Sequence, residues 1–400
     1  MPAREPSAAD AGAAASRLEK AARFWDDQAA SGDAESRHWL ASPQVARLVN
    51  ARTTGDPDRY PISAFRDQFR EHLPVRRALS VGCGTGDLER AVVRAGIAAH
   101  VDGIDISAAA LARAADLASR DRALAQRITY ERADAASWLP AVAAGRYQLI
   151  LFHGSLHHIA DLETVLGSCA AILRGSGRSE SGLLYVDEYV GPSRDLWCET
   201  DLAPARELFA RVAPEHRRTP ELLQPMAPDD PSEMIRSAEI EPVLRSQFEV
   251  LKYRPYYGNV IYPLLSAIRG DSFNHPDVEI LVCDAIAREE ALIEAGGLRP
   301  LFALFVARPR SIAGAASAAG AAQHAPHAAL PLPSYEAELA LRGLLAERGA
   351  ELRDTYAEIV RLNELIREME SSRAWRVHDW LERSVRAPWR RLRRSRPRGE

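Results

Sequence analysis

The sequence predicts an α/β fold in which a largely parallel sheet is covered by helices on both faces. From residue 77 onward, short apolar runs alternate with longer helix-like segments, which is the pattern of strand–helix–strand units. A hydrophobic content of 46% and a charged content of 26% suit a globular protein with a substantial core. The expected strands are ALSVGC, HVDGIDI, ITYERAD, YQLILFH and GLLYVDEYV, with FEVLKYRPY and LFALFVARP closing the sheet as a pair.

The elements outside this alternation follow from composition. Residues 18–75 are expected to form helices interrupted at Pro43, Gly55, Pro57 and Pro61, because Pro and Gly end helices. AVVRAG, SAAALARAADLASRDRAL and LETVLGSCAAIL are expected to be the helices between strands. Residues 191–245 form a Pro-rich, mostly helical insertion. Open α/β sheets leave their binding side to be closed by added segments, so this insertion is expected to be a lid.

The whole chain of 400 residues is long for one domain, so one main domain with appendages is expected. Leu345, Leu352, Ile359 and Ile366 recur every seventh residue, but the companion heptad position is poorly apolar. The expected parts are a disordered N-terminus at 1–17, the main domain at 18–310, a flexible Ala/Gly/Pro linker at 311–333, an amphipathic helix or coiled coil at 334–372 and a basic Trp-containing tail at 373–400.

Charge and cysteine usage exclude several protein classes. A net charge of −4 argues against nucleic-acid binding by the whole chain. The four cysteines are dispersed and form no CxxC pair, which opposes a disulfide framework or a zinc ribbon and favours a reducing cytoplasm. The first twenty residues do not resemble a signal peptide, and no run of about eighteen apolar residues predicts a membrane span.

The stretch LSVGCGTGDLER places three glycines, Gly82, Gly84 and Gly86, directly after a strand. Such a turn lets a ligand approach the backbone at a helix N-terminus. The Lys-Ser/Thr of a P-loop is missing, the spacing differs from the dinucleotide pattern GxGxxG, and Asp87 would repel a pyrophosphate. Asp105 ends the second strand, where it can accept ribose hydroxyls, and Asp134 follows the third, where it can accept an adenine amino group. Together these features predict a nucleoside ligand without phosphates.

At these residues the chain resembles the Rossmann-like class I S-adenosylmethionine-dependent methyltransferases, over residues 77–310. The resemblance implies an enzyme whose cofactor is S-adenosyl-L-methionine, with Asp105 on the ribose, Asp134 and the Ala135 backbone on the adenine, and His153 beside the methionyl end. The cofactor residues that it implies are Gly82, Cys83, Gly84, Gly86, Asp105, Ile106, Asp134, Ala135 and His153. The chain departs from the pattern at Ser80, where many members carry an acid.

A narrower likeness suggests the acceptor. HWLASPQVARLVNARTTGDPD, FHGSLHHIADLE, DEYVGPSRDLW and DPSEMIRSAEI resemble a bacterial subgroup of methyltransferases associated with cell-surface polysaccharide synthesis. SSRAWRVHDWLERSVRAPWR is similar to tails of glycan-modifying transferases. These likenesses imply O-methylation of a glycan or glycan-lipid intermediate. A small-molecule natural product as acceptor, a non-catalytic adenosylmethionine-binding scaffold and an NAD oxidoreductase are the alternatives, in that order.

If the acceptor is a hydroxyl, a general base should remove its proton. His157 and His158 follow the fourth strand and Asp187 and Glu188 end the fifth, so all four lie at the binding edge of the sheet. His157 is the preferred base, because adjacent histidines point differently and at most one should face the pocket. No third ligand with suitable spacing accompanies the histidines, so no metal is expected. Arg194 and Arg236 are candidates to grip an anionic sugar or phosphate.

The C-terminal tail carries ten arginines between Arg373 and Arg398, with Trp375, Trp380 and Trp389. Tryptophans with surrounding arginines are typical of an interfacial helix on anionic lipid. The prediction is a cytoplasmic enzyme held peripherally at the inner face of the membrane, with self-association through 334–372 as a further option and no nucleic-acid partner. A packing helix or a free basic tail are the opposing interpretations.

Overall fold

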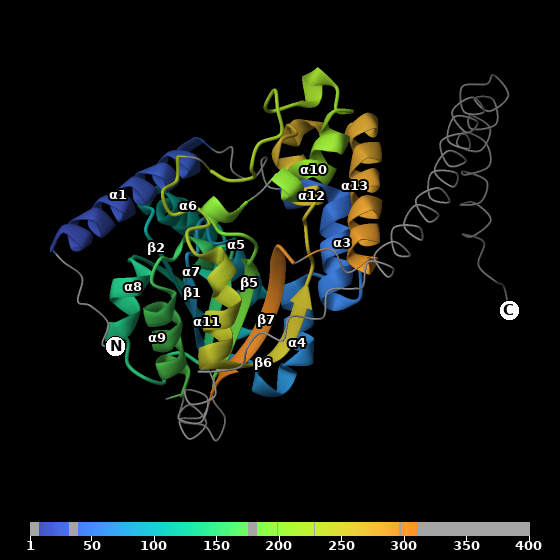
Figure 1. Cartoon of the computed structure of the whole chain (residues 1–400). Coiled ribbons are helices and arrows are strands. Elements are labelled where there is room, and N and C mark those ends of the chain that lie inside the picture. The colour runs from blue at the N-terminus through green and yellow to red at the C-terminus, as the bar shows by residue number, and fades with distance from the viewer. Residues whose placement is uncertain are drawn as a thin grey trace, which may run out of the picture. The chain divides into compact units, whose positions relative to one another are not determined.

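All seven predicted strands are present and form one mixed sheet (Figure 1). The order is β3-β2-β1-β4-β5-β7-β6; β1 to β5 are parallel, and β7 runs antiparallel to both β5 and β6. The crossover between β1 and β4 makes the point at which such sheets bind ligands. The strands are β1 (Val75–Val81), β2 (Ala98–Asp105), β3 (Ile128–Arg132), β4 (Leu149–His153), β5 (Leu183–Tyr189), β6 (Phe248–Pro255) and β7 (Phe302–Pro309).

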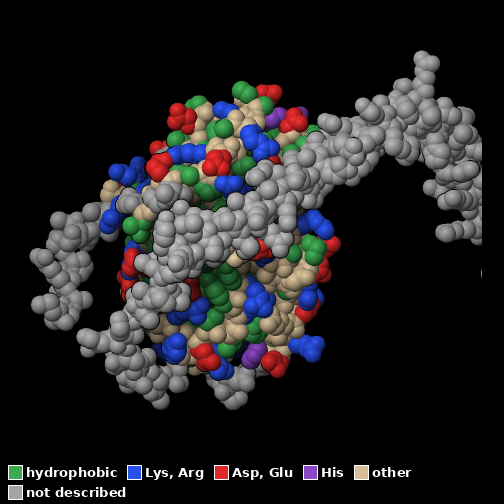
Figure 2. Space-filling view, turned by 45° about the vertical axis from the view of Figure 1, so that its right-hand side comes forward, with side chains coloured by type: hydrophobic (Ala, Val, Ile, Leu, Met, Phe, Trp, Pro, Cys, Tyr) green, Lys and Arg blue, Asp and Glu red, His purple; other side chains and the backbone are tan. Residues whose placement is uncertain are grey.

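The computed structural model describes residues 8–31, 39–174, 182–197, 199–227, 229–295, 298 and 300–310. The predictions for the linker at 311–333, the helix or coiled coil at 334–372 and the tail at 373–400 lie outside these residues. No helix within the described ranges is both long and apolar enough to span a bilayer. On the face shown in Figure 2, basic and acidic side chains are interspersed.

Helices cover both faces of the sheet, as predicted. One face packs against α4 (Pro61–Gln68), α5 (Asp87–Arg94), α6 (Ala108–Ser119) and α7 (Arg122–Ala125). The other packs against α8 (Ala135–Trp138), α9 (Leu162–Arg174) and α11 (Ile240–Gln247), which lie in front of the sheet in Figure 1. The central strands β4 and β5 are buried almost throughout, because apolar side chains on both of their faces meet these layers.

A second group of helices packs beside the sheet around its own core. It comprises α3 (Pro43–Thr54), α10 (Glu199–Phe209), α12 (Ile261–Ser266) and α13 (Pro276–Glu294) (Figure 1). The fully buried Glu289 of α13 accepts hydrogen bonds from the backbone N–H groups of Gly258, Val260 and Ile261 and pairs with Arg52. One carboxylate thereby joins three segments of the group.

This group shows where the parts of the insertion predicted to be a lid, 191–245, lie. The apolar face of α10, with Leu202 and Phe209, is buried in the second core, and α11 covers the sheet. Of the insertion, Pro231, Ser232 and Ile235 line the cavity described below. The apolar face of α10 packs against α12 and α13, and among the described residues of the insertion those at the binding edge belong to the turn at 231–235.

The N-terminal helices begin and end as predicted, with one correction. Pro43 and Pro61 each start a helix, and Gly55 ends α3 in the left-handed conformation at φ +86°. The expectation that 1–17 is disordered is wrong from Ala8 onward, because α1 spans Ala8–Ser31. Ala is the strongest helix former, so the helix extends in the N-terminal direction from its packed part, where Ala21 is buried.

Candidate functional site

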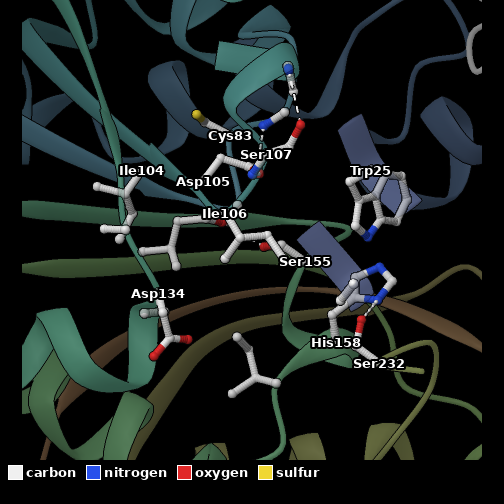
Figure 3. A pocket seen from close by; sticks show the side chains of 18 of the residues that line it. Trp25, Cys83, Ile104, Asp105, Ile106, Ser107, Asp134, Ser155, His158 and Ser232 are labelled. Carbon is white, nitrogen blue, oxygen red and sulfur yellow. Dashed lines mark hydrogen bonds between the residues drawn. The ribbon is translucent and has the colours of Figure 1, made fainter. Parts of the chain in front are cut away.

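A cavity of about 750 Å³ lies at the carboxyl ends of β1, β2 and β4, where the strand order switches. Its walls come from three parts of the chain: the glycine turn and strand ends, helix α1, and the turn at 231–235. Figure 3 shows Asp134 and Asp105 toward one side of this cavity and Trp25 and His158 toward the other. Eight of the nine predicted cofactor residues line it: Gly82, Cys83, Gly84, Asp105, Ile106, Asp134, Ala135 and His153.

The three glycines have different reasons to be glycine. All have positive φ, which disfavours side chains. A β-carbon on Gly84 would meet nothing within 4 Å, so its backbone faces open space. A β-carbon on Gly82 would lie 2.4 Å from the Ser155 β-carbon. Gly86 corrects the prediction that it lines the cofactor, because it is absent from the cavity wall and a β-carbon there would lie 2.3 Å from the Tyr130 hydroxyl. Gly86 therefore permits close packing of α5.

The two predicted carboxylates sit at the ends of adjacent strands. Asp105 at the end of β2 accepts from the Gly84 N–H at 2.8 Å and the Ser107 N–H at 2.9 Å, and burial raises its pKa. Asp134 caps α8, its Oδ2 accepting from the Ser137 N–H at 3.1 Å. Each carboxylate oxygen can accept more than one hydrogen bond, so both groups retain capacity for a ligand.

His153 ends β4 on the opposite side of the glycine turn from Asp105. Its Nε2 lies 3.9 Å from the buried Asp187 of β5. Asp187 also accepts from the Tyr256 hydroxyl at 2.7 Å, and burial raises its pKa. Asp187 therefore accepts from Tyr256 and lies near His153, and it does not line the cavity where the predicted base would act.

Glu89 is one of the wall residues that the sequence prediction missed. Glu89, in α5, is fully buried, and neither of its carboxylate oxygens has a hydrogen-bond partner. Burial raises its pKa to about 7; the Ser80 hydroxyl and His153 oppose this. Buried carboxylates without partners are rare and costly. The available signal was the neutral Ser80 at a position often acidic in the resembled family, together with an acid on the apolar side of a predicted helix.

The structure argues against His157 as the base. Its Nδ1 lies 2.5 Å from Glu188 Oε1, and it does not line the cavity, whereas His158 does. Burial alone would lower the pKa of His157, but Glu188, Glu233 and Asp230 raise it to about 9. The imidazole is therefore already protonated near neutral pH and has no free lone pair to accept another proton.

The contacts of Glu188 indicate a structural role. Its carboxylate accepts from the backbone N–H groups of Ser155 at 2.8 Å, Leu156 at 2.6 Å and Tyr189 at 2.7 Å. Burial would raise its pKa, but His157 and these N–H donors more than offset this and lower it. Glu188 thereby fixes the turn after β4, and these contacts occupy the acceptor capacity that the predicted role as a base would need.

His158 is the predicted catalytic residue that reaches the cavity. Its Nδ1 lies 3.3 Å from Asp230 Oδ2 and 3.2 Å from the Ser232 hydroxyl (Figure 3). Asp230 is fully buried, and hydrogen bonds from His158 and Ser232 lower its pKa against the effect of burial. Trp25 of α1 donates to the same carboxylate at 3.1 Å and packs edge-on against the His158 ring. These contacts fix the ring and leave Nε2 as its unassigned nitrogen.

The two arginines predicted to grip an anion are engaged elsewhere. Arg236 pairs with Glu163 at 2.7 Å and Glu239 at 2.6 Å. Arg194 donates to the backbone carbonyl of Asp230 at 2.9 Å. Both stabilise the turn that carries Ser232, and neither lines the cavity.

The fold supplies a third potential metal ligand that spacing did not reveal. Glu233 lies with His157 and His158 so that one ligand atom from each falls within 4.8 Å of the others. The His157 Nε2 is 3.9 Å from Glu233 Oε1, so the protonated imidazole already offsets this carboxylate's charge. A metal would have to displace that proton.

Comparisons with known proteins agree with this geometry. The family described as "Methyltransferase domain" matches residues 78–177. A ubiquinone biosynthesis O-methyltransferase of Burkholderia multivorans is 36% identical over 120 residues, 30% of this chain and 49% of the relative. Its namesake in Ralstonia nicotianae is 37% identical over 105 residues, 26% and 42% of the two chains. The chain thus spans less than half the length of these relatives.

Solved structures with similar folds include a geranyl diphosphate C-methyltransferase from Streptomyces coelicolor, with a TM-score of 0.42 and 13% identity over 74% of this chain and 98% of that one. A phosphoethanolamine N-methyltransferase 2 from Haemonchus contortus also has a TM-score of 0.42, with 14% identity over 72% and 60%.

The residues of the cavity fit the cofactor of this domain family. Gly84 leaves its backbone open, Asp105 and Asp134 can accept from a ribose and an adenine, and the unpaired Glu89 suits a ligand with a cationic group. No phosphate-binding element accompanies them in the glycine turn. Residues 78–177 therefore match a methyltransferase domain, and the residues of the cavity fit S-adenosylmethionine as its cofactor.

Proposed function

We propose that the protein transfers the methyl group of S-adenosylmethionine to a hydroxyl oxygen of a small, largely apolar acceptor. The observation that carries this proposal is His158, a histidine held by a fully buried aspartate in the wall of the cofactor cavity. An amine that is neutral when it attacks needs less help from a base, whereas a hydroxyl benefits from one.

The composition of the cavity supports a small apolar acceptor. The side chains contributed by α1 and by the turns around His158 are mainly apolar, and pockets of this kind bind ligands with few polar groups. They include Leu18, Ala21, Trp25, Ile159, Pro231 and Ile235. Arg194 and Arg236, which the sequence offered to grip an anion, are engaged with protein groups and do not line the cavity; the arginine in its wall is Arg17 of α1.

The relatives support oxygen as the acceptor atom. Two relatives that match part of the chain carry the name ubiquinone biosynthesis O-methyltransferase. The finer prediction of a glycan or glycan-lipid acceptor rests on the sequence likeness and on the tail at 373–400, and receives no support from these relatives. We therefore rank the small-molecule acceptor first and keep the glycan in the test.

The chain's own residues suffice for the proton transfer. When bound, S-adenosylmethionine supplies a methyl group on a sulfonium, whose carbon–sulfur bond breaks as the carbon–oxygen bond forms. With Nδ1 held by Asp230, the His158 Nε2 accepts the hydroxyl proton, and the Asp230 carboxylate stabilises the resulting imidazolium. Trp25 and other residues of α1 line the cavity, and Trp25 packs against the His158 ring.

The test is a methyl-transfer screen with labelled cofactor. The panel should contain phenols and alcohols with apolar substituents, matching amines, nucleotide sugars and bacterial lipid extracts. We expect label on the hydroxyl compounds, lost in His158→Ala and retained in Glu131→Gln, an exposed carboxylate outside the cavity. Label on sugars alone would support the glycan acceptor, and label on amines alone would refute O-methylation.

A further inference from the structure

We propose that Glu89 binds the ammonium group of the methionyl part of S-adenosylmethionine. The inference rests on the proposed cofactor and goes beyond it by assigning a residue that the motif pattern does not contain. In the resembled family an acid often stands at the position of Ser80, and here that position is a neutral side chain.

Strand order places Glu89 at the correct end of the cavity. Asp134 follows β3, Asp105 ends β2, the glycine turn follows β1 and His153 ends β4, and these strands are neighbours in that order. A ligand with its adenine at Asp134 and its ribose at Asp105 therefore extends over the glycine turn toward His153. Glu89 lies in the wall of this part, close enough to Ser80 and His153 for both to affect its pKa.

The burial and lack of partners of the Glu89 carboxylate suit a cationic ligand. Glu89 has no exposed surface, and both of its oxygens lack a hydrogen-bond partner. No described residue uses the Glu89 carboxylate as a hydrogen-bond acceptor. Two other buried glutamates, Glu188 and Glu289, each accept several backbone N–H groups. Orphaned acceptors in a ligand cavity are expected where the ligand provides the donors.

The charged and titratable groups around Glu89 leave this role open. Arg90, the next residue, donates to the Thr85 carbonyl at 2.7 Å and to Asp87. His153 of β4, Cys83 of the glycine turn and Tyr130 of β3 lie close enough to Glu89 for electrostatic interaction with it. Of these groups only Arg90 carries a fixed positive charge, and its guanidinium is committed elsewhere. An ammonium with three donors would satisfy both oxygens.

Two ligands separate this contact from the rest of the site. S-adenosylhomocysteine carries the amino acid part, and 5′-methylthioadenosine lacks it while keeping adenine and ribose. Calorimetric titration of the full chain at pH 8 should show Glu89→Gln weakening S-adenosylhomocysteine by about 10- to 100-fold, the range for a charge-assisted hydrogen bond. Binding of 5′-methylthioadenosine should change by less than about twofold.

Asp105→Asn and Glu131→Gln are the matched controls. Asp105 faces the ribose that both ligands share, so its variant should weaken both, and Glu131→Gln should weaken neither. Equal effects of Glu89→Gln on both ligands, or no effect on either, would overturn the assignment. Failure of the wild-type chain to bind either ligand would instead overturn the proposed function.

Two further measurements distinguish loss of the ammonium contact from misfolding of the Glu89→Gln variant. On the wild-type chain, an S-adenosylhomocysteine analogue with hydrogen in place of its amino group should bind about 10- to 100-fold more weakly. Binding of the parent ligand should strengthen from pH 6 to pH 8, because the ammonium favours ionised Glu89, and this dependence should diminish in Glu89→Gln. Equal affinity for the two ligands would refute the ammonium contact without any mutation.

Discussion

Removal of the Glu89 charge should stabilise the ligand-free protein, and the gain should depend on pH. The folded pKa is about 7, against an ordinary value of 4.5. The folded state therefore binds more protons than the unfolded state between these values, and stability falls as pH rises through this window. A difference of about 2.5 units at 1.36 kcal/mol per unit corresponds to a penalty of about 3 kcal/mol above pH 7, which Gln does not incur.

The assay is urea unfolding of the wild type and Glu89→Gln without ligand, at pH 4.5 and pH 7.5. We expect similar stability at the lower pH, where Glu89 is largely protonated when folded, and an advantage of about 1–3 kcal/mol for the variant at the higher pH. His157, with its pKa of about 9, titrates in both proteins and cancels in the difference. A variant that is equally destabilised at both pH values would show that the carboxylate is engaged in the folded protein and would refute the reasoning.

Four other substitutions test the remaining assignments. Asp105→Ala should weaken cofactor binding by ~1–3 kcal/mol in calorimetry, because it removes the ribose acceptor, and unchanged affinity in a folded variant would contradict that role. His158→Ala should lower turnover by roughly 10²–10⁴ with cofactor affinity nearly intact. His157→Ala should lower the unfolding free energy by about 3–5 kcal/mol, because Glu188 would stay buried without its counter-charge. The reverse pattern would restore His157 as the base. Gly86→Ala should lower the thermal midpoint through its positive φ and its clash with Tyr130, and wild-type stability would show that α5 can shift.

The sequence predicted the elements that depend on local pattern. The strands are short apolar runs, the helices between them are amphipathic or Ala-rich, and Gly82 and Gly84 stand where a strand turns into a helix. These signals act over a few residues, so one chain suffices to detect them. Asp105 and Asp134, predicted to bind the adenosyl part, lie in the cavity wall for a similar reason, because Asp105 ends β2 and Asp134 follows shortly after β3.

The parts that sequence could not supply depend on contacts between distant residues. His157 and His158 differ in role because Glu188, thirty residues onward, holds one ring and Asp230, over seventy residues onward, holds the other. Likewise, α10 was expected over the cavity, but its partner surface on α12 and α13 lies far along the chain. Spacing cannot show which of two adjacent side chains a distant carboxylate will meet.

Helix α1 has a consequence for how the domain can be cut or combined. Residues 78–177 carry the glycine turn and the two carboxylates predicted to bind the adenosyl part, Asp105 and Asp134. Trp25 in the cavity wall lies before this segment, and Asp230, which contacts His158, lies after it. Asp26 joins α1 to the start of α6 through Ser107 at 2.7 Å and the Ala109 N–H at 3.0 Å. A fragment or chimaera limited to the matched residues would keep the glycine turn and both carboxylates. It would lose the wall formed by α1 and the Asp230 contact of His158. The smallest transplantable unit therefore begins before Trp25 and extends past Ile235.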